Sequence, residues 1–152
     1  VYGVATVQEE LGLRGARTSA FGIDPHIGIA IDVGFATDYP ESEKAIVGEV
    51  KLGKGPILHR GANINPKLQK LLEKIANKKK IKYQLTGEPR ATGTDANVIQ
   101  LTRSGVATTL VSVPNRYMHT PVEVISLDDV EATIKLLVEF IASLTGKEDF
   151  KI

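Results

Sequence analysis

The segment "IGIAIDV", Ile27 to Val33, decides the fold, because its apolar side chains occupy both alternating faces of an extended chain. A strand with one face in water would alternate apolar and polar residues instead. The segment therefore predicts a strand buried on both sides, as in a parallel sheet covered by helices. The segment "ATTLVSV", residues 107–113, has the same character and ends at Pro114. We expect both strands inside one sheet.

Strand and helix patterns alternate on either side of these segments. The pattern predicts further strands at residues 1–7, 45–53 and 81–85, and helices at residues 12–20 and 94–103. Asn65 and Pro66 form a helix start, since Asn caps well and Pro needs no amide hydrogen there. This order predicts the α/β class, as one three-layer α/β/α sandwich with a largely parallel mixed sheet over residues 1–152.

A long helix is expected near the end of the sequence. Ser126 and Asp129 have the S-x-x-D spacing of an N-terminal cap, and Gly146 can close the helix. One side of this helix carries most of its apolar residues, so we expect that side to cover the sheet. These residues are Val130, Ile134, Leu137, Val138 and Ile141.

The composition excludes several classes of function. The chain of 152 residues has 19 Lys and Arg against 18 Asp and Glu, so we expect no nucleic-acid partner and no membrane partner. The lysine run at residues 78–80 follows a helix end, where cations meet the negative end of the dipole. The chain has no cysteine, which excludes disulfides and thiolate chemistry and fits a cytoplasmic location. High Lys and Ile content is typical of a thermophile.

Acidic residues and a histidine stand where the predicted buried strands end. Glu9 and Glu10 follow the first strand in "ATVQEELGLRGA", Asp32 ends the second, and His119 lies just past a third. Ligands of open α/β sheets gather at the carboxyl ends of strands. Adjacent carboxylates in a cleft raise each other's pKa unless a cation compensates them. Glu10, Asp32 and His119 could bind such a cation, and Glu9 could take a proton from its water.

Each of these residues also has a structural interpretation. Adjacent glutamates are common on surfaces, an aspartate after a strand often caps a turn, and a single histidine usually satisfies a local hydrogen bond. The segment "RATGTDAN", residues 90–97, could hold an anion before a helix, or Asp95 could simply face the helix dipole. We interpret His26 and His59 as solvated loop residues.

The ordered motifs "TVQEELGLRGA", "IAIDVGFATD", "GKGPIL", "GTDAN" and "RYMHTPVE" cover nearly the whole chain. In this order they resemble the tetrahedral and deblocking aminopeptidases, the two-metal metallopeptidases of archaea and bacteria that are sometimes labelled endoglucanases. The resemblance implies that Glu9 is the general base and that Glu10 and Asp32 each bind one of two divalent metal ions, zinc or cobalt. It implies that His119 shares the metal of Glu10. It also implies that Gly93, Thr94 and Asp95 line the cleft for peptide substrates.

The resemblance further implies that part of the enzyme is missing from this sequence. Family members take a histidine and a bridging aspartate ligand from sequence that would precede Val1. They also carry an inserted β-rich domain that builds the dimer contact of a hollow dodecamer. We therefore expect residues 1–152 to be the carboxyl-terminal portion of the catalytic domain, which alone would bind metal weakly and catalyse poorly.

Two other functions fit the same residues. The acid pair could indicate a glycoside hydrolase (endoglucanase), although glycosidase carboxylates flank a bond about 5 Å or more apart. Adjacent Glu9 and Glu10 do not readily provide that arrangement, and aromatic residues, which bind sugars, make up only 5% of the chain. The chain could also be a non-catalytic assembly or binding module.

Overall fold

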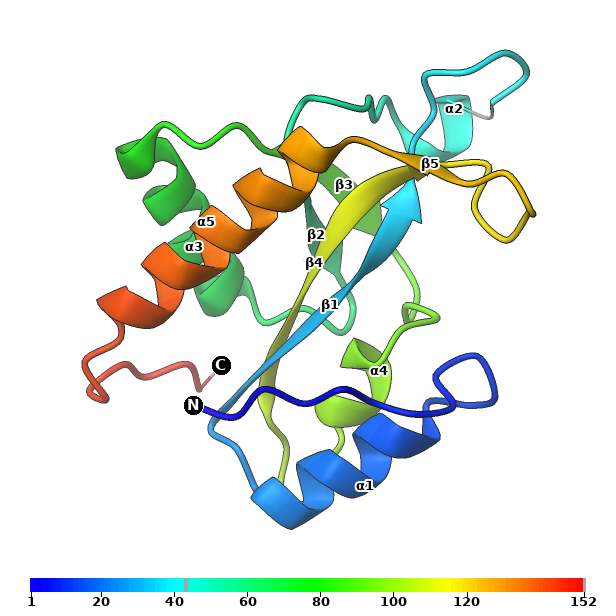
Figure 1. Ribbon diagram of the computed structural model, residues 1–152. Coiled ribbons are helices and arrows are strands. Elements are labelled where there is room, and N and C mark those ends of the chain that lie inside the picture. The colour runs from blue at the N-terminus through cyan, green and yellow to red at the C-terminus, as the bar shows by residue number, and fades with distance from the viewer. Residues whose placement is uncertain (43, 152) are drawn as a thin grey trace.

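The computed structural model describes residues 1–42 and 44–151 and contains a mixed sheet with helices on both faces (Figure 1). Its strands are β1 (Ile27–Phe35), β2 (Ile57–Gly61), β3 (Gln84–Glu88), β4 (Ala107–Arg116) and β5 (Val124–Ile125). The order is β1-β4-β2-β3, and β5 pairs with β4. β1 runs parallel to β4 and β2 parallel to β3, whereas β2 runs antiparallel to β4. The predicted α/β class is confirmed.

Helices form a layer on each side of the sheet. They are α1 (Arg14–Ile23), α2 (Lys44–Val47), α3 (Pro66–Lys79), α4 (Ala96–Ile99) and α5 (Leu127–Ser143). The largest apolar cluster lies between α3, α5 and one sheet face, and includes Leu58, Leu68, Leu72, Val111, Leu136 and Phe140. A smaller cluster, Ala30, Ile64, Ala96 and Leu110, places α4 on the other face. Apolar burial on both faces explains the uninterrupted apolar run of β4. β1 has a similar run, but it lies at the edge of the described sheet with Ile31 and Phe35 exposed, so its predicted burial on both sides is not seen there.

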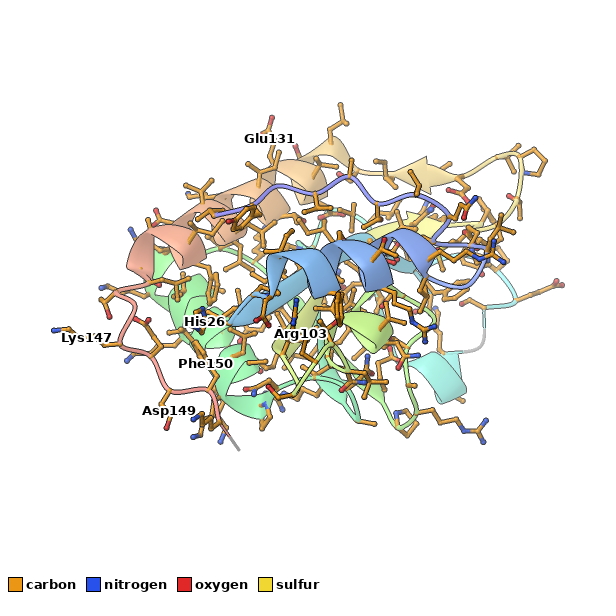
Figure 2. The ribbon with its side chains drawn as sticks, turned by 90° about the horizontal axis from the view of Figure 1, so that it is seen from below. His26, Arg103, Glu131, Lys147, Asp149 and Phe150 are labelled. Carbon is orange, nitrogen blue, oxygen red and sulfur yellow. The ribbon has the colours of Figure 1, made fainter. Side chains whose placement is uncertain are left out.

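The helix start at Asn65 is confirmed. The Asn65 side chain accepts hydrogen bonds from the Lys67 and Leu68 amides, both at 3.0 Å, and Pro66 is the first helical residue. Asn65 also donates to the Phe150 carbonyl oxygen at 2.7 Å, so the C-terminal segment lies against the start of α3 (Figure 2). The cap therefore sets both the helix start and the path of the last residues.

Arg103 holds α1 against the segment that follows α4 (Figure 2). Its Nε and Nη2 atoms donate to the Phe21 carbonyl oxygen at 3.0 and 2.7 Å. Its guanidinium carbon lies 4.2 Å from the centre of the Phe21 ring, in cation–π contact. Because the Glu9–Glu10 loop leads directly into α1, this anchor also limits where that loop can lie.

The predicted strand at residues 1–7 is wrong. The segment is extended and mostly exposed, and it pairs with no strand of the described sheet. The Val7 carbonyl oxygen instead accepts a hydrogen bond from the Gly15 amide at 2.9 Å, which fixes the segment to α1. The valines and Tyr2 gave a strand pattern, but a strand also needs a partner backbone.

Three other element boundaries differ from the expectations. The predicted strand at residues 45–53 is replaced by α2 and a loop, because Gly48 and Gly53 adopt positive φ angles of 91° and 74° that break an extended chain. The helix predicted at residues 94–103 is limited to α4. The strand predicted from residue 81 begins at Gln84, since the Ile81 amide closes the end of α3 through the Ala76 carbonyl.

α5 covers one face of the sheet as predicted, and Leu137 packs against the core, but Ile134, Val138 and Ile141, which were predicted to cover the sheet, are exposed. Asp129, Thr133, Leu136 and Phe140 face the core, whereas a second apolar stripe faces outward. The stripe consists of Leu127, Ile134, Val138 and Ile141, and Glu131 projects from the helix nearby (Figure 2).

Asp129 explains how α5 is rotated. Its carboxylate does not cap the helix but accepts hydrogen bonds from the Gly53 and Gly55 amides, both at 2.7 Å. These two bonds bury Asp129 against the loop before β2, and the helix turns with it. Despite the outward stripe, no helix in residues 1–42 and 44–151 is long and apolar enough to cross a bilayer.

Candidate functional site

The two glutamates lie in a tight loop that folds back onto α1. The Glu9 carbonyl oxygen accepts hydrogen bonds from the Gly12 and Leu13 amides at 3.2 and 2.9 Å. Gly12 has a φ of 101°, a conformation that favours glycine. Gly15 lacks a Cβ for a different reason, since a Cβ there would overlap the backbone of Val7. The backbone thus holds both carboxylates at the amino end of α1.

Asp32 and His119 approach this loop from the sheet. Asp32 lies near the carboxyl end of β1, and its Oδ1 accepts the Val33 amide hydrogen at 2.7 Å. His119 follows β4 with a φ of 64°, and its amide donates to Glu123 Oε1 at 2.7 Å. Its Nε2 lies 3.3 Å from Glu10 Oε1. The fold therefore pairs Glu10 with His119.

The carboxylates in this region destabilise one another in their ionised forms. The pKa of Glu9 is raised, first by burial and then by the charges of Asp32, Glu10 and Asp95. The pKa of Asp32 is also raised, mainly by burial and further by Asp95 and Glu10, although the Val33 amide acts against this. His119 lowers both pKa values. These four carboxylates and His119 are called the acid cluster below.

Asp95 carries an oxygen that the protein leaves without a partner. Its Oδ2 accepts a hydrogen bond from the Thr6 hydroxyl at 2.7 Å, whereas its buried Oδ1 has no hydrogen-bond partner among the described residues. Asp95 precedes α4 without a side-chain cap bond in the described chain. A buried unpaired carboxylate oxygen is costly, and a cation or ammonium donor would relieve that cost.

The other two residues of the predicted cleft loop differ in their surroundings. Gly93 is exposed, with open space where a Cβ would stand. The Thr94 hydroxyl lies 2.9 Å from the Thr92 hydroxyl, which accepts a hydrogen bond from the Asn63 side chain at 3.0 Å. Thr94 therefore supports the loop from inside, while Gly93 faces solvent.

The acid cluster has donor atoms that suit a divalent cation, but too few of them converge to hold one. Carboxylate oxygens and imidazole nitrogen suit zinc and related ions, and a cation would offset the raised pKa values of Glu9 and Asp32. Within the described part of the chain, however, no three His, Asp or Glu side chains converge closely enough to hold a metal. Glu10 and His119 form one pair, and Asp32 lies apart from it.

An ion pair that sequence patterns did not indicate supports the edge of the site. Arg116 donates through Nε and Nη2 to the two carboxylate oxygens of Asp38, at 2.8 and 2.6 Å. These hydrogen bonds hold the pKa of Asp38 below its usual range, aided by the Leu52 amide. The pair joins the ends of β1 and β4 just before the His119 loop. The two residues are distant in sequence, so no local spacing could have revealed them.

The interpretation of His59 as a solvated loop residue is wrong, because His59 lies on β2 and is only 6% exposed. The sequence signal for a buried strand histidine was its place next to two apolar residues in "ILHRG". His26 is an exposed residue of the loop before β1, as expected (Figure 2).

Residues 1–136 match the family model described as M42 glutamyl aminopeptidase, and the chain belongs to this family. It is 54% identical over 136 residues to a lysyl aminopeptidase of Pyrococcus furiosus, a match that covers 90% of this chain and 38% of that protein.

Solved structures of similar proteins agree with the fold. A TET aminopeptidase from a marine-sediment Thaumarchaeota archaeon is 36% identical with a TM-score of 0.85, covering 92% of this chain and 39% of that one. The TET1 peptidase of Pyrococcus horikoshii, which can assemble into a tetrahedron or a large octahedral shell, is 34% identical with a TM-score of 0.71. That match covers 91% of this chain and 40% of the peptidase. The chain thus spans about two-fifths of the length of these relatives.

Proposed function

We propose that the intact protein containing this chain is a metal-dependent aminopeptidase that removes amino-terminal residues from peptides. The observation that carries the proposal is the acid cluster itself, in a chain that belongs to an aminopeptidase family. Glu9 and Asp32 have raised pKa values, and Asp95 keeps a buried oxygen without a partner among the described residues. This much uncompensated carboxylate suits a site that binds cations.

Glu10, Asp32 and His119 are the residues of this chain that would hold the metal ions, zinc or cobalt. Their oxygen and nitrogen donors accept either metal. Because no three of these side chains converge among the described residues, we propose that Asp32 and the Glu10–His119 pair bind different ions, each completed by ligands from outside residues 1–152. A bound divalent cation would polarise the scissile carbonyl and lower the pKa of a bound water to about 7.

Glu9 is the proposed general base. Its pKa is raised towards neutral pH, and a base whose pKa lies near the working pH can both accept and return a proton. It would take a proton from the attacking water and deliver that proton to the leaving amine. Gly93, Thr94 and Asp95 would line the cleft, where the negative charge of Asp95 would attract a positively charged group. The peptide amino terminus carries such a charge.

The catalytic domain is proposed to continue beyond this chain. β1 lies at the edge of the sheet, although its sequence has the character of an inner strand. The outward stripe of α5 and the side chains of Ile31 and Phe35 on β1 are also exposed and apolar. Further strands and helices from an upstream segment would cover these surfaces and bring the missing ligands.

We also infer that the intact protein forms a homo-oligomer, with a dodecamer as the expected size. The assembly of the related TET1 peptidase supports this inference. Light scattering on the purified intact protein measures its mass directly. A monomer would contradict the inference, and a large but inactive assembly would favour a structural role instead.

The test of the proposed function is chelator-sensitive release of amino acids from peptides by the intact protein. We expect activity that disappears after dialysis against a chelator and returns with zinc or cobalt. Elemental analysis should show two ions per complete site and fewer on residues 1–152 alone. Release of reducing sugar from cellulose without release of amino acids would instead establish the glycosidase alternative.

A further inference from the structure

A row of polar side chains crosses the sheet on the face that carries Asp32. Asp32 on β1 is the register partner of Ser112 on β4, so the two side chains stand next to each other on the same face. Ser112 Oγ lies 2.9 Å from Nε2 of His59 on β2. On β3, Thr86 Oγ1 and Glu88 Oε1 lie 2.9 and 3.1 Å from His59 Nδ1. These five residues are called the polar row.

The His59–Ser112 contact follows from the strand register. Ile57 is the register partner of Ser112 across the antiparallel pair, and His59 lies two residues further along the same face. The contact is therefore diagonal, a distance that a ring can bridge but a short side chain cannot. On the other side, His59 is directly opposite Thr86.

The middle of the polar row is buried, and its hydrogen bonds are satisfied. Ser112 is 1% exposed and His59 6% exposed, beside apolar Ile57 and Leu110. A buried hydroxyl and imidazole would each cost free energy without partners. Each ring nitrogen of His59 has a partner, and Ser112 has His59. Such a network also specifies orientation, because each member limits how its neighbour can donate or accept.

The chemistry of the partners sets the direction of these hydrogen bonds. A carboxylate oxygen accepts, so we assign the hydrogen to His59 Nδ1, which donates towards Glu88 Oε1 and the Thr86 hydroxyl oxygen. Burial lowers the pKa of His59, which favours the neutral ring, so Nε2 accepts the hydroxyl hydrogen of Ser112. The Ser112 oxygen then presents lone pairs to the Asp32 side.

We propose that Ser112 and His59 are positioning residues for Asp32: His59 orients the Ser112 hydroxyl, and Ser112, the register neighbour of Asp32 on the same face, limits the directions that the Asp32 carboxylate can take. The inference rests on the proposed role of Asp32 as a metal ligand. Groups that orient a metal ligand typically change metal affinity or activity 10- to 100-fold when removed. Neither residue needs to touch substrate for this effect.

The first experiment measures cobalt affinity and the cobalt absorption spectrum of the intact protein, because the spectrum reports ligand geometry independently of activity. We expect Ser112→Ala to weaken cobalt binding about 10-fold and to shift the spectrum. His59→Gln should act in the same direction with a smaller effect. Thr109→Val is the matched control, since this buried hydroxyl lies on the opposite face of β4 and donates to Gln69 at 3.3 Å.

The double variant Ser112→Ala with His59→Gln tests whether His59 acts through Ser112. If it does, the double variant binds cobalt no more weakly than Ser112→Ala alone. Additive losses, an equal loss in Thr109→Val, or no change in Ser112→Ala would each refute the positioning role. If the unaltered intact protein binds no cobalt, the proposed metal site itself is refuted and this inference falls with it.

A second measurement does not depend on metal binding or on a His59 variant that folds. Nitrogen-15 NMR of histidine-labelled intact protein distinguishes the two neutral ring forms. We expect the hydrogen of His59 on Nδ1, and we expect the Nε2 signal to move in Ser112→Ala. A hydrogen on Nε2 would contradict the proposed hydrogen-bond direction, in which Ser112 donates to His59.

Discussion

Two aspartates near the end of β1 have opposite electrostatic environments. Asp38 receives two hydrogen bonds from Arg116, at 2.8 and 2.6 Å, and its pKa is lowered. Asp32 lies among other carboxylates, and its pKa is raised. Both residues belong to the same motif, "IAIDVGFATD".

The difference separates an acid whose charge is balanced by a cation of the chain from acids that lack such a partner. Asp38 has its cation within the chain, so its charge contributes to the stability of the fold. The acid cluster has no lysine or arginine among the groups that shift the pKa values of Glu9 and Asp32. A protein keeps such a cluster at a cost in stability, which a bound cation can offset. The following changes test this contrast, from the largest expected effect to the smallest.

Glu9→Gln in the intact protein should lower turnover roughly 10³-fold, the typical contribution of a general base. Metal content should stay the same, because the proposed ligands are untouched. Peptide hydrolysis and elemental analysis measure the two quantities. Glu10→Gln is the paired variant and should lose metal as well. Turnover retained in Glu9→Gln would refute the assignment of the base.

Asp38→Asn should lower the free energy of unfolding by about 2 kcal/mol at pH 7, since it removes charged hydrogen bonds with Arg116 and the Leu52 amide. Urea denaturation of the intact protein measures the change. Glu49→Gln, which breaks the exposed 2.9 Å pair with Lys51, is the control and should have no measurable effect. Equal effects would show that burial of the Asp38 pair is unimportant.

The pH dependence of stability should differ in sign between the two regions. Glu9 and Asp32 have folded pKa values above their ordinary values of 4.5 and 3.8, so the folded state binds extra protons there. Their contribution to the free energy of unfolding is fully favourable when the pH is below those ordinary pKa values. It is lost as pH rises through the raised pKa values of the folded state. Asp38 is the reverse: its contribution is present above 3.8 and is lost as pH falls through its lowered pKa.

Thermal melting of the chelated protein between pH 4 and 7 can test this sign. The melting temperature of the variant with both Glu9→Gln and Asp32→Asn should exceed that of the unaltered protein most at neutral pH. The gain should shrink towards acid pH. Excess zinc should reverse the order at neutral pH, because it stabilises only the protein that keeps its ligand. A gain that grows towards acid pH would contradict the raised pKa values.

Thr6→Val should have the smallest effect, about a 3-fold loss in kcat/KM, equivalent to one ordinary hydrogen bond. The Thr6 hydroxyl donates to Asp95 Oδ2 and so restrains the direction of the free Oδ1. Thr18→Val, which removes a hydroxyl bound to carbonyls within α1, is the matched control. Equal activities of the two variants would show that Asp95 needs no such restraint.

Local sequence patterns predicted β1 and β4 of the sheet better than the helices and loops that pack against it. Residues 107–113 were recognisable because burial on both faces leaves a direct mark on sequence. The similar apolar run at Ile27–Val33 also located β1, although β1 lies at the edge of the described sheet. The pairing of Glu10 with His119 was implied by the family resemblance, not by strand ends, since residues 1–7 form no strand of the described sheet. The rotation of α5 could not be predicted, because its cause is Asp129 binding the amides of a loop far away in sequence.

The failures at residues 1–7 and at His59 have a common physical cause. Both depend on contacts between distant segments, which periodicity does not record. The first segment looked like a strand, but the Thr6 hydroxyl holds it to Asp95, 89 residues away, at 2.7 Å. His59 looked like a loop residue, yet it lies on β2 between β3 and β4. The register that brings Ser112 to its ring is a property of the folded sheet.

The glycine at position 15 has a consequence for how this site can change over generations. No side chain fits there while Val7 keeps its place, so even an alanine would displace the chain that leads into Glu9 and Glu10. Both acids would remain in the sequence but move away from His119 and Asp32. A relative can thus keep Glu9 and Glu10 in its sequence and yet lose their placement beside His119 and Asp32. Gly15 is the position to inspect first in such a relative.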